Sequence, residues 1–100
     1  MQPNMKMLQQ MQNRIQKMQQ ELEETTVEGT AGGGAVVVAV NGLRAVQSVK
    51  INPEAVDPSD IEMLEDMVLA AIQEAMKTAE DLAANKMAAI TGGINIPGLM

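Results

Sequence analysis

The chain has 100 residues and a formal net charge of −6, and it contains no His, Cys, Phe, Tyr or Trp. Without histidine and cysteine it lacks the usual general base, the nucleophilic thiol and the commonest metal ligands, so we expect no enzyme, no cofactor and no small-molecule substrate. Without aromatic residues it lacks the side chains on which single-stranded nucleic acid stacks. No apolar run approaches the ~20 residues that a membrane span needs, so we expect a cytoplasmic protein with no membrane partner.

A seam of apolar residues predicts the first helix, an arm helix over residues 1–24. Most of the other positions are glutamine, which forms helices well, and Pro3 suits a first helical turn. We expect the methionines to pack along the seam, because methionine fills irregular gaps well and no other soft ligand accompanies it. Apolar residues recur three and four positions apart at Leu8, Met11, Ile15, Met18 and Leu22.

Residues 25–52 predict a three-stranded antiparallel meander. The run Ala35–Val40 is rich in β-branched valine, which favours an extended strand. The triple glycine Gly32–Gly34 frees the backbone to reverse before this strand, and it lacks the Gly-Lys-Ser/Thr of a phosphate-binding loop. After the strand, Asn41-Gly42 predicts a type I′ hairpin turn with φ > 0 at both residues. Both faces of the middle strand are apolar, so we expect a helix on one face and a second subunit on the other.

A long helix is expected over residues 57–91, with Asp57 as its N-cap and Pro58 in its first turn. The segment Met67–Ile72 is apolar nearly all round, which predicts burial against both the sheet and a partner. The expected dimer-interface residues are Val68, Leu69 and Ile72.

Residues 92–100 form an apolar tail after the helix-breaking Thr91-Gly92-Gly93. This tail is either loosely docked or a hydrophobic latch on the partner subunit.

Charge is segregated along the chain. Residues 1–20 contain three basic residues and no acid, all the acids lie between Glu21 and Asp81, and Lys86 is the only charged residue after them. The start of the first helix and the end of the second should lie at the same distal end, so we expect a basic tip on an acidic body. The expected DNA-binding residues are Lys6, Gln10, Asn13, Arg14, Lys17 and Lys86. The alternative is that they are ordinary solvated helix residues.

Carboxylates are frequent on the second helix, but no second set converges on them. We expect a solvated face and no metal site from Glu62, Glu65, Asp66, Glu80 and Asp81.

Several short motifs occur in a fixed order along the chain, after the Met/Gln-rich first helix. They are Val27-Glu28-Gly29-x-Ala31-Gly32-Gly33-Gly34, Val40-Asn41-Gly42, Val49-Lys50-Ile51-x-Pro53-Glu54, Glu62-Met63-Leu64-Glu65-Asp66, Thr91-Gly92-Gly93 and Pro97-Gly98. Over essentially its whole length the chain resembles the YbaB/EbfC family of bacterial nucleoid-associated proteins.

The resemblance implies an α+β fold, a helix–three-stranded antiparallel meander–long helix, assembled as a tweezer-like homodimer with projecting helical arms. It also implies cofactor-free binding of double-stranded DNA by those arms, in the nucleoid, with effects on nucleoid organisation or gene expression. A second hypothesis is a protein-interaction adaptor that uses the acidic body and the Met-lined arms, with DNA binding incidental.

Overall fold

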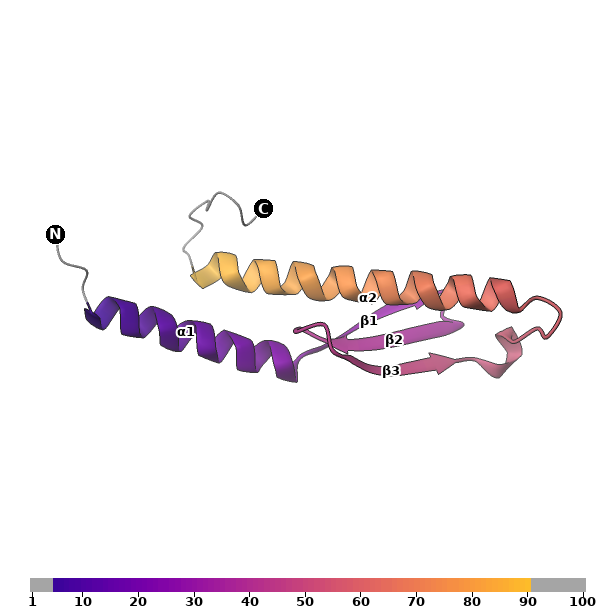
Figure 1. Cartoon of the computed structure of the whole chain (residues 1–100), viewed down its shortest axis with the longest axis horizontal. Coiled ribbons are helices and arrows are strands. Elements are labelled where there is room, and N and C mark those ends of the chain that lie inside the picture. The colour runs from indigo at the N-terminus through magenta and orange to yellow at the C-terminus, as the bar shows by residue number, and fades with distance from the viewer. Residues whose placement is uncertain (1–4, 91–100) are drawn as a thin grey trace.

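The computed structural model describes residues 5–90 of the chain. The elements follow in the expected helix–sheet–helix order, and the molecule is elongated, 69 × 25 × 15 Å (Figure 1). They are α1 (Met5–Glu24), β1 (Thr26–Ala31), β2 (Val36–Asn41), β3 (Val46–Ile51), the short 3-10 helix η1 (Pro53–Ala55) and α2 (Ile61–Ile90). The apolar tail expected over residues 92–100 lies outside the described residues, as does Pro3.

The three strands form the antiparallel meander that the sequence predicts, in the order β1-β2-β3. Val38 of β2 pairs with Gly29 on one side and with Val49 on the other. A bulge between Ala39 and Val40 shifts the register of β3. The side chains of β2 that face α2 are fully buried and form the centre of the core, because alternate residues of a strand point to the same face. These residues are Val36, Val38 and Val40.

The triple glycine forms the reversal between β1 and β2, as expected. Gly32, Gly33 and Gly34 have φ values of 63°, 67° and 95°, in the left-handed region that glycine enters without strain.

The turn between β2 and β3 differs from the prediction. Asn41 and Gly42 do not have positive φ; the only described non-glycine residue that does is Arg44, at 66°. A four-residue connection replaces the two-residue turn, because the Asn41 carboxamide oxygen accepts hydrogen bonds from the N–H groups of Leu43 and Ala45, both at 2.9 Å. The predicted hairpin is present, but the type I′ geometry was wrong.

The start of α2 also differs from the prediction. The helix begins at Ile61, and Asp60 caps it by accepting a hydrogen bond from the Met63 N–H at 3.2 Å. Asp57 instead accepts from the Ser59 hydroxyl at 2.7 Å and from the Ser59 N–H at 2.9 Å, and these bonds lower its pKa from the ordinary value. Asp57 is therefore committed to a turn that precedes the helix, and Pro58 lies in that turn.

The helix α2 lies very close to β1. A Cβ atom at Gly29 would collide with the Ala71 carbonyl oxygen and the Ala75 N–H nitrogen, and it would lie 2.9 Å from the Ala75 Cα. Ala71, Ala75 and Ala79 recur every four residues and are fully buried, so they form the flat face of α2 that rests on the sheet.

The uncovered apolar surface lies on the same face of the sheet as α2, which corrects an expectation. α2 packs on β1 and β2. The register of the sheet places Val46, Val49 and Ile51 of β3 on the α2 side, yet they remain 39–51% exposed. The opposite face is mostly polar, with Thr26, Glu28, Thr30, Ser48 and Lys50. The apolar surface that lacks a cover is therefore the strip beside α2, not the far side of the sheet.

Candidate nucleic-acid interface

From Met5 to Gln20 the first helix presents an exposed polar face that contains no acidic residue. Lys6, Gln10, Asn13 and Lys17 recur at helical spacing with Arg14 beside them, and all five belong to the continuous helix α1 and are exposed. The buried side of the helix is held by Met18 and Leu22, at 8% and 2% exposure. At ~1.5 Å per residue, the basic positions from Lys6 to Lys17 span about 16 Å. The structure thus brings the five expected α1 residues onto one accessible strip, here called the arm strip.

Lys86 belongs to a different environment from the arm strip. Its ammonium lies 3.3 Å from the carboxylate of Glu21, with side-chain exposures of 32% for the lysine and 47% for the glutamate. The ion pair joins α2 to α1 near the sheet, where α1 becomes acidic. Sequence reasoning missed this pairing, since nothing local links two residues that lie 65 positions apart.

Gly42 contacts the end of α1 that joins the sheet, here called the arm root. Its N–H donates to the Leu22 carbonyl at 2.7 Å and to the Thr25 carbonyl at 3.0 Å, so the loop after β2 is bonded to the last turn of α1. A Cβ at this position would lie 2.7 Å from the Leu22 carbonyl oxygen. Gly42 thus permits the close approach that sets how α1 leaves the sheet. The sequence predicted only a hairpin turn at Asn41-Gly42 and did not predict this contact with α1.

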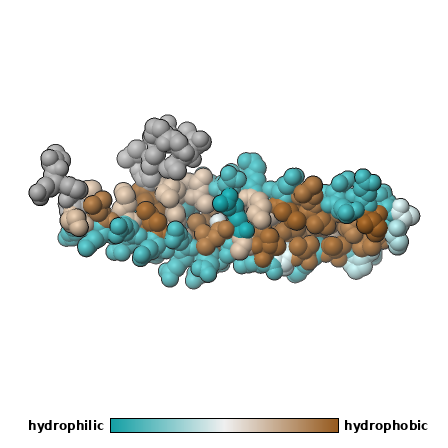
Figure 2. Space-filling model, in the orientation of Figure 1, coloured by the Kyte–Doolittle hydropathy of each residue, from teal (hydrophilic) through white to brown (hydrophobic). Residues whose placement is uncertain are grey.

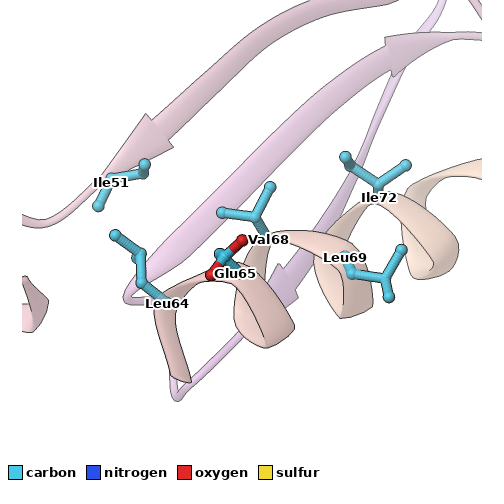
Figure 3. A pocket seen from close by; sticks show the side chains of 6 residues that line it. All are labelled: Ile51, Leu64, Glu65, Val68, Leu69 and Ile72. Atoms are coloured by element: carbon cyan, nitrogen blue, oxygen red, sulfur yellow. The ribbon is translucent and has the colours of Figure 1, made fainter. Parts of the chain in front are cut away.

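A shallow apolar groove of about 380 Å³ lies between β3 and α2. It is lined by Ile51, Leu64, Glu65, Val68, Leu69 and Ile72, so it contains all three expected dimer-interface residues (Figure 3). Val68 and Ile72 also pack against the core, whereas Leu69 is 55% exposed and does not. Figure 2 shows the apolar surface as a brown area over the part of the molecule where α2 lies beside the sheet.

The acidic side chains of the body assemble no metal site. Among residues 5–90, no group of three or more carboxylates, histidines or cysteines is close enough to hold a metal ion. Another ion pair, between Lys77 and Asp81 at 3.7 Å, joins residues one turn apart on α2. Within the same described part, no helix is long and apolar enough to cross a membrane.

Comparison with known proteins agrees with this architecture. A solved structure of an uncharacterized protein, HP0035 from Helicobacter pylori, matches the chain with a TM-score of 0.77 and 22% sequence identity. The match covers 86% of this chain and 90% of that one. At this identity the likeness speaks for the fold alone.

Sequence relatives are closer. The nucleoid-associated protein TTE0040 of Caldanaerobacter subterraneus subsp. tengcongensis is 56% identical over 94 residues, which cover 94% of this chain and 85% of the relative. A nucleoid-associated protein of Chloroflexus aggregans is 56% identical over 90 residues, which cover 90% of each chain. The model of the YbaB/EbfC DNA-binding family matches residues 1–94. The chain belongs to the YbaB/EbfC DNA-binding family.

Proposed function

We propose that this protein is a non-enzymatic, nucleoid-associated protein that binds double-stranded DNA through the arm strip of α1. The observation that carries the proposal is an exposed polar face without acidic residues from Met5 to Gln20, on a helix whose tip extends past the end of α2 (Figure 1). DNA-binding proteins gain most of their non-specific affinity by neutralising phosphates with Lys and Arg. Lys6, Arg14 and Lys17 supply the charge, and Gln10 and Asn13 supply hydrogen bonds to the backbone or to base edges.

The size of the arm strip suits a duplex. Its span of about 16 Å corresponds to roughly five base-pair steps at ~3.4 Å each. Three charges per arm give a small electrostatic contribution, so two arms acting together would bind much more strongly than one. Lys86 is a weaker candidate for phosphate contact than Arg14 or Lys17, since Glu21 already neutralises it.

The second arm would come from a homodimer formed through the β3–α2 groove. Ile51 of β3 lines the groove, and the exposed Val46 and Val49 on the same side of β3 extend its apolar surface. Contiguous apolar surface of this kind marks an interaction site on a soluble protein. We infer a second copy as the occupant, because α2 itself carries an apolar series that starts in the groove and recurs at intervals of three, four or seven residues: Leu69, Ile72, Met76, Ala83, Met87 and Ile90. In such a homodimer each chain would contribute one projecting α1 helix, which would give the tweezer-like shape with two arms.

The names of the relatives support a place in the nucleoid. We propose that the protein acts there, in the bacterial cytoplasm, on nucleoid organisation or gene expression. The rival function, a protein-interaction adaptor that binds through the acidic body, has less support because the family is a DNA-binding one. It predicts that removal of the arm charges leaves the main interaction intact.

The test is a titration of duplex DNA at several salt concentrations. We expect the Lys6→Gln/Arg14→Gln/Lys17→Gln variant to bind all duplexes more weakly. The slope of log K against log salt should flatten by up to ~0.9 for each phosphate that the variant no longer neutralises. Lys50→Gln is the matched control, since Lys50 lies on the polar face of the sheet away from the arm. Single-stranded DNA should bind no better than duplex. Wild-type affinity and slope in the triple variant would favour the adaptor.

A further inference from the structure

Asn41-Gly42 is the only Asn-Gly pair in the chain, and such pairs are chemically reactive. The backbone nitrogen of the glycine can attack the carboxamide carbon of the asparagine, because glycine has no side chain to hinder the approach. The new C–N bond closes a five-membered succinimide, and the side-chain nitrogen leaves as ammonia. Water then opens the ring, which gives either aspartate or isoaspartate, in which the side-chain methylene has entered the backbone.

The loop after β2 activates the Asn41 carboxamide for this attack. Its oxygen accepts hydrogen bonds from the N–H groups of Leu43 and Ala45, both at 2.9 Å. Two N–H donors on one carbonyl oxygen stabilise the negative charge that develops there when a nucleophile adds. The loop also holds itself by backbone bonds at 2.9 Å, from the Asn41 N–H to the Ala45 carbonyl and from the Arg44 N–H to the Asn41 carbonyl. The activating contacts therefore do not involve α1.

The attacking nitrogen, by contrast, is blocked by the arm root. Gly42 is buried, and its N–H donates to the Leu22 carbonyl in the last turn of α1 and to the Thr25 carbonyl just beyond the helix. The nitrogen must lose this proton to water before it can attack. A buried N–H bonded to protein carbonyls meets water only after a local opening. Separation of α1 from the loop is the opening that would free the nitrogen while leaving the carboxamide activated.

We propose that Asn41 is a deamidation site that the docked arm keeps unreacted, and that it reacts when α1 separates from the loop after β2. Isoaspartate lengthens the backbone where it approaches α1 so closely that a Cβ on Gly42 would lie 2.7 Å from the Leu22 carbonyl oxygen. Aspartate places a charge at a residue that is only 6% exposed. Either product prevents the arm root from docking as before, so the reaction makes the separation permanent. The proposal does not depend on DNA binding.

The test compares deamidation rates in variants that weaken the two ends of β2. Leu22→Ala truncates a buried side chain at the arm root, and Val36→Ala, the matched control, truncates a buried side chain at the other end of the strand. Dilute denaturant brings the control to the same melting temperature, so that global unfolding contributes equally. We expect isoaspartate at residue 41 to form about tenfold faster or more in Leu22→Ala, because only this variant opens the arm root. Peptide mass spectrometry measures the rates.

Equal rates in the two variants would overturn the proposal, because global unfolding would then be what exposes the site. A folded wild type that reacts as fast as the denatured chain would also overturn it. If Leu22→Ala does not fold, Met18→Ala takes its place, since Met18 is the other buried residue of α1. Hydrogen exchange on the deamidated fraction, separated by ion exchange, tests the second step. We expect the last turn of α1 to exchange faster there than in the intact protein, and unchanged exchange would show that the arm docks again.

Discussion

Gly29 lies directly beneath Ala75, with space for a hydrogen atom and none for a methyl group. The helix backbone, not a movable side chain, occupies the position where a Cβ at residue 29 would stand. Gly33, by contrast, has nothing within 4 Å of its own Cβ position. The two glycines are therefore needed for different reasons, one for close packing and the other for its φ of 67°.

The first prediction compares these glycines. We expect Gly29→Ala to destabilise the fold by roughly 3 kcal/mol or more, since overpacking that displaces backbone lies at the upper end of the usual range. Gly33→Ala should cost about 1–2 kcal/mol, the strain of a left-handed residue. Thermal melts followed by far-UV circular dichroism measure both. Equal tolerance at the two positions would contradict the close contact of α2 with β1.

The second prediction concerns the arm root. Gly42→Ala should destabilise the protein because its methyl group would collide with the last turn of α1. Arg44→Gly should be neutral or slightly stabilising, because it removes a strained left-handed residue at a small cost of ~0.4–1 kcal/mol in unfolded-chain entropy. The same melts report the outcome. If Arg44→Gly destabilised the protein more than Gly42→Ala, the result would contradict the four-residue connection and favour the two-residue Asn41-Gly42 turn.

The third prediction separates interface from core on α2. Leu69→Glu should give a folded monomer, because Leu69 lies in the groove but outside the core, whereas Val68→Glu should unfold the protein. An unpaired charge in a packed interface costs about 3–5 kcal/mol, so Leu69→Glu should weaken association at least a hundredfold.

The control for this experiment is Ala70→Glu, which changes an exposed residue on the other side of α2 and should leave the assembly unchanged. Light scattering coupled to size exclusion gives the masses. A wild-type monomer at micromolar concentration would eliminate the groove as a dimer interface.

The fourth prediction concerns the ion pair at the arm root. Glu21→Gln should strengthen DNA binding modestly, because it removes an acid and releases Lys86, while Lys86→Gln should weaken binding less than Lys17→Gln does. The pair is about one-third to one-half exposed, so either change should alter stability by at most about 1 kcal/mol. Filter-binding titrations at fixed salt decide the ranking. An effect of Lys86→Gln as large as that of Lys17→Gln would put Lys86 in the DNA contact.

The fifth prediction concerns the start of α2. Asp60→Ala should cost about 1 kcal/mol because the N-cap is removed, more than Asp57→Ala does. The pKa of Asp57 is lowered by its bonds to Ser59, so its stabilising effect is present above the unfolded-state pKa and is lost as the pH falls through the folded-state value. Ser59→Ala should raise the pKa of Asp57, as a carboxyl NMR titration would report.

Local patterns predicted the elements, and long-range contacts decided the details. The seam of α1 and the valine run of β2 repeat over many residues, so the helix and the central strand were predictable. The start of α2 was not, because Asp57, Ser59 and Asp60 all have side chains that can cap, and only the folded structure shows which bond each makes.

In the candidate site, too, local features could be predicted from the sequence and long-range contacts could not. The arm strip depends on spacing within one helix, and the sequence is sufficient for that. The bond between Gly42 and Leu22 and the pair between Glu21 and Lys86 join residues distant in sequence, and no local signal announces them. The alanines 71, 75 and 79, with a glycine inside β1, were the one readable sign of close packing, since glycine in a strand often marks a nearby backbone.

The separation of charge along a molecule 69 Å long gives the protein a strong electric dipole. In the field of a polyanion the acidic sheet end is repelled and the arm end is attracted, so on the proposed function we expect a diffusing molecule to turn arm-first before it touches DNA. Such alignment raises the fraction of collisions that bind, and added salt removes it because the Debye length at 0.15 M is only ~8 Å. Association rates should therefore fall with salt more steeply than the few arm charges alone would require, and the outward-facing acidic end should keep bound molecules apart on the same duplex.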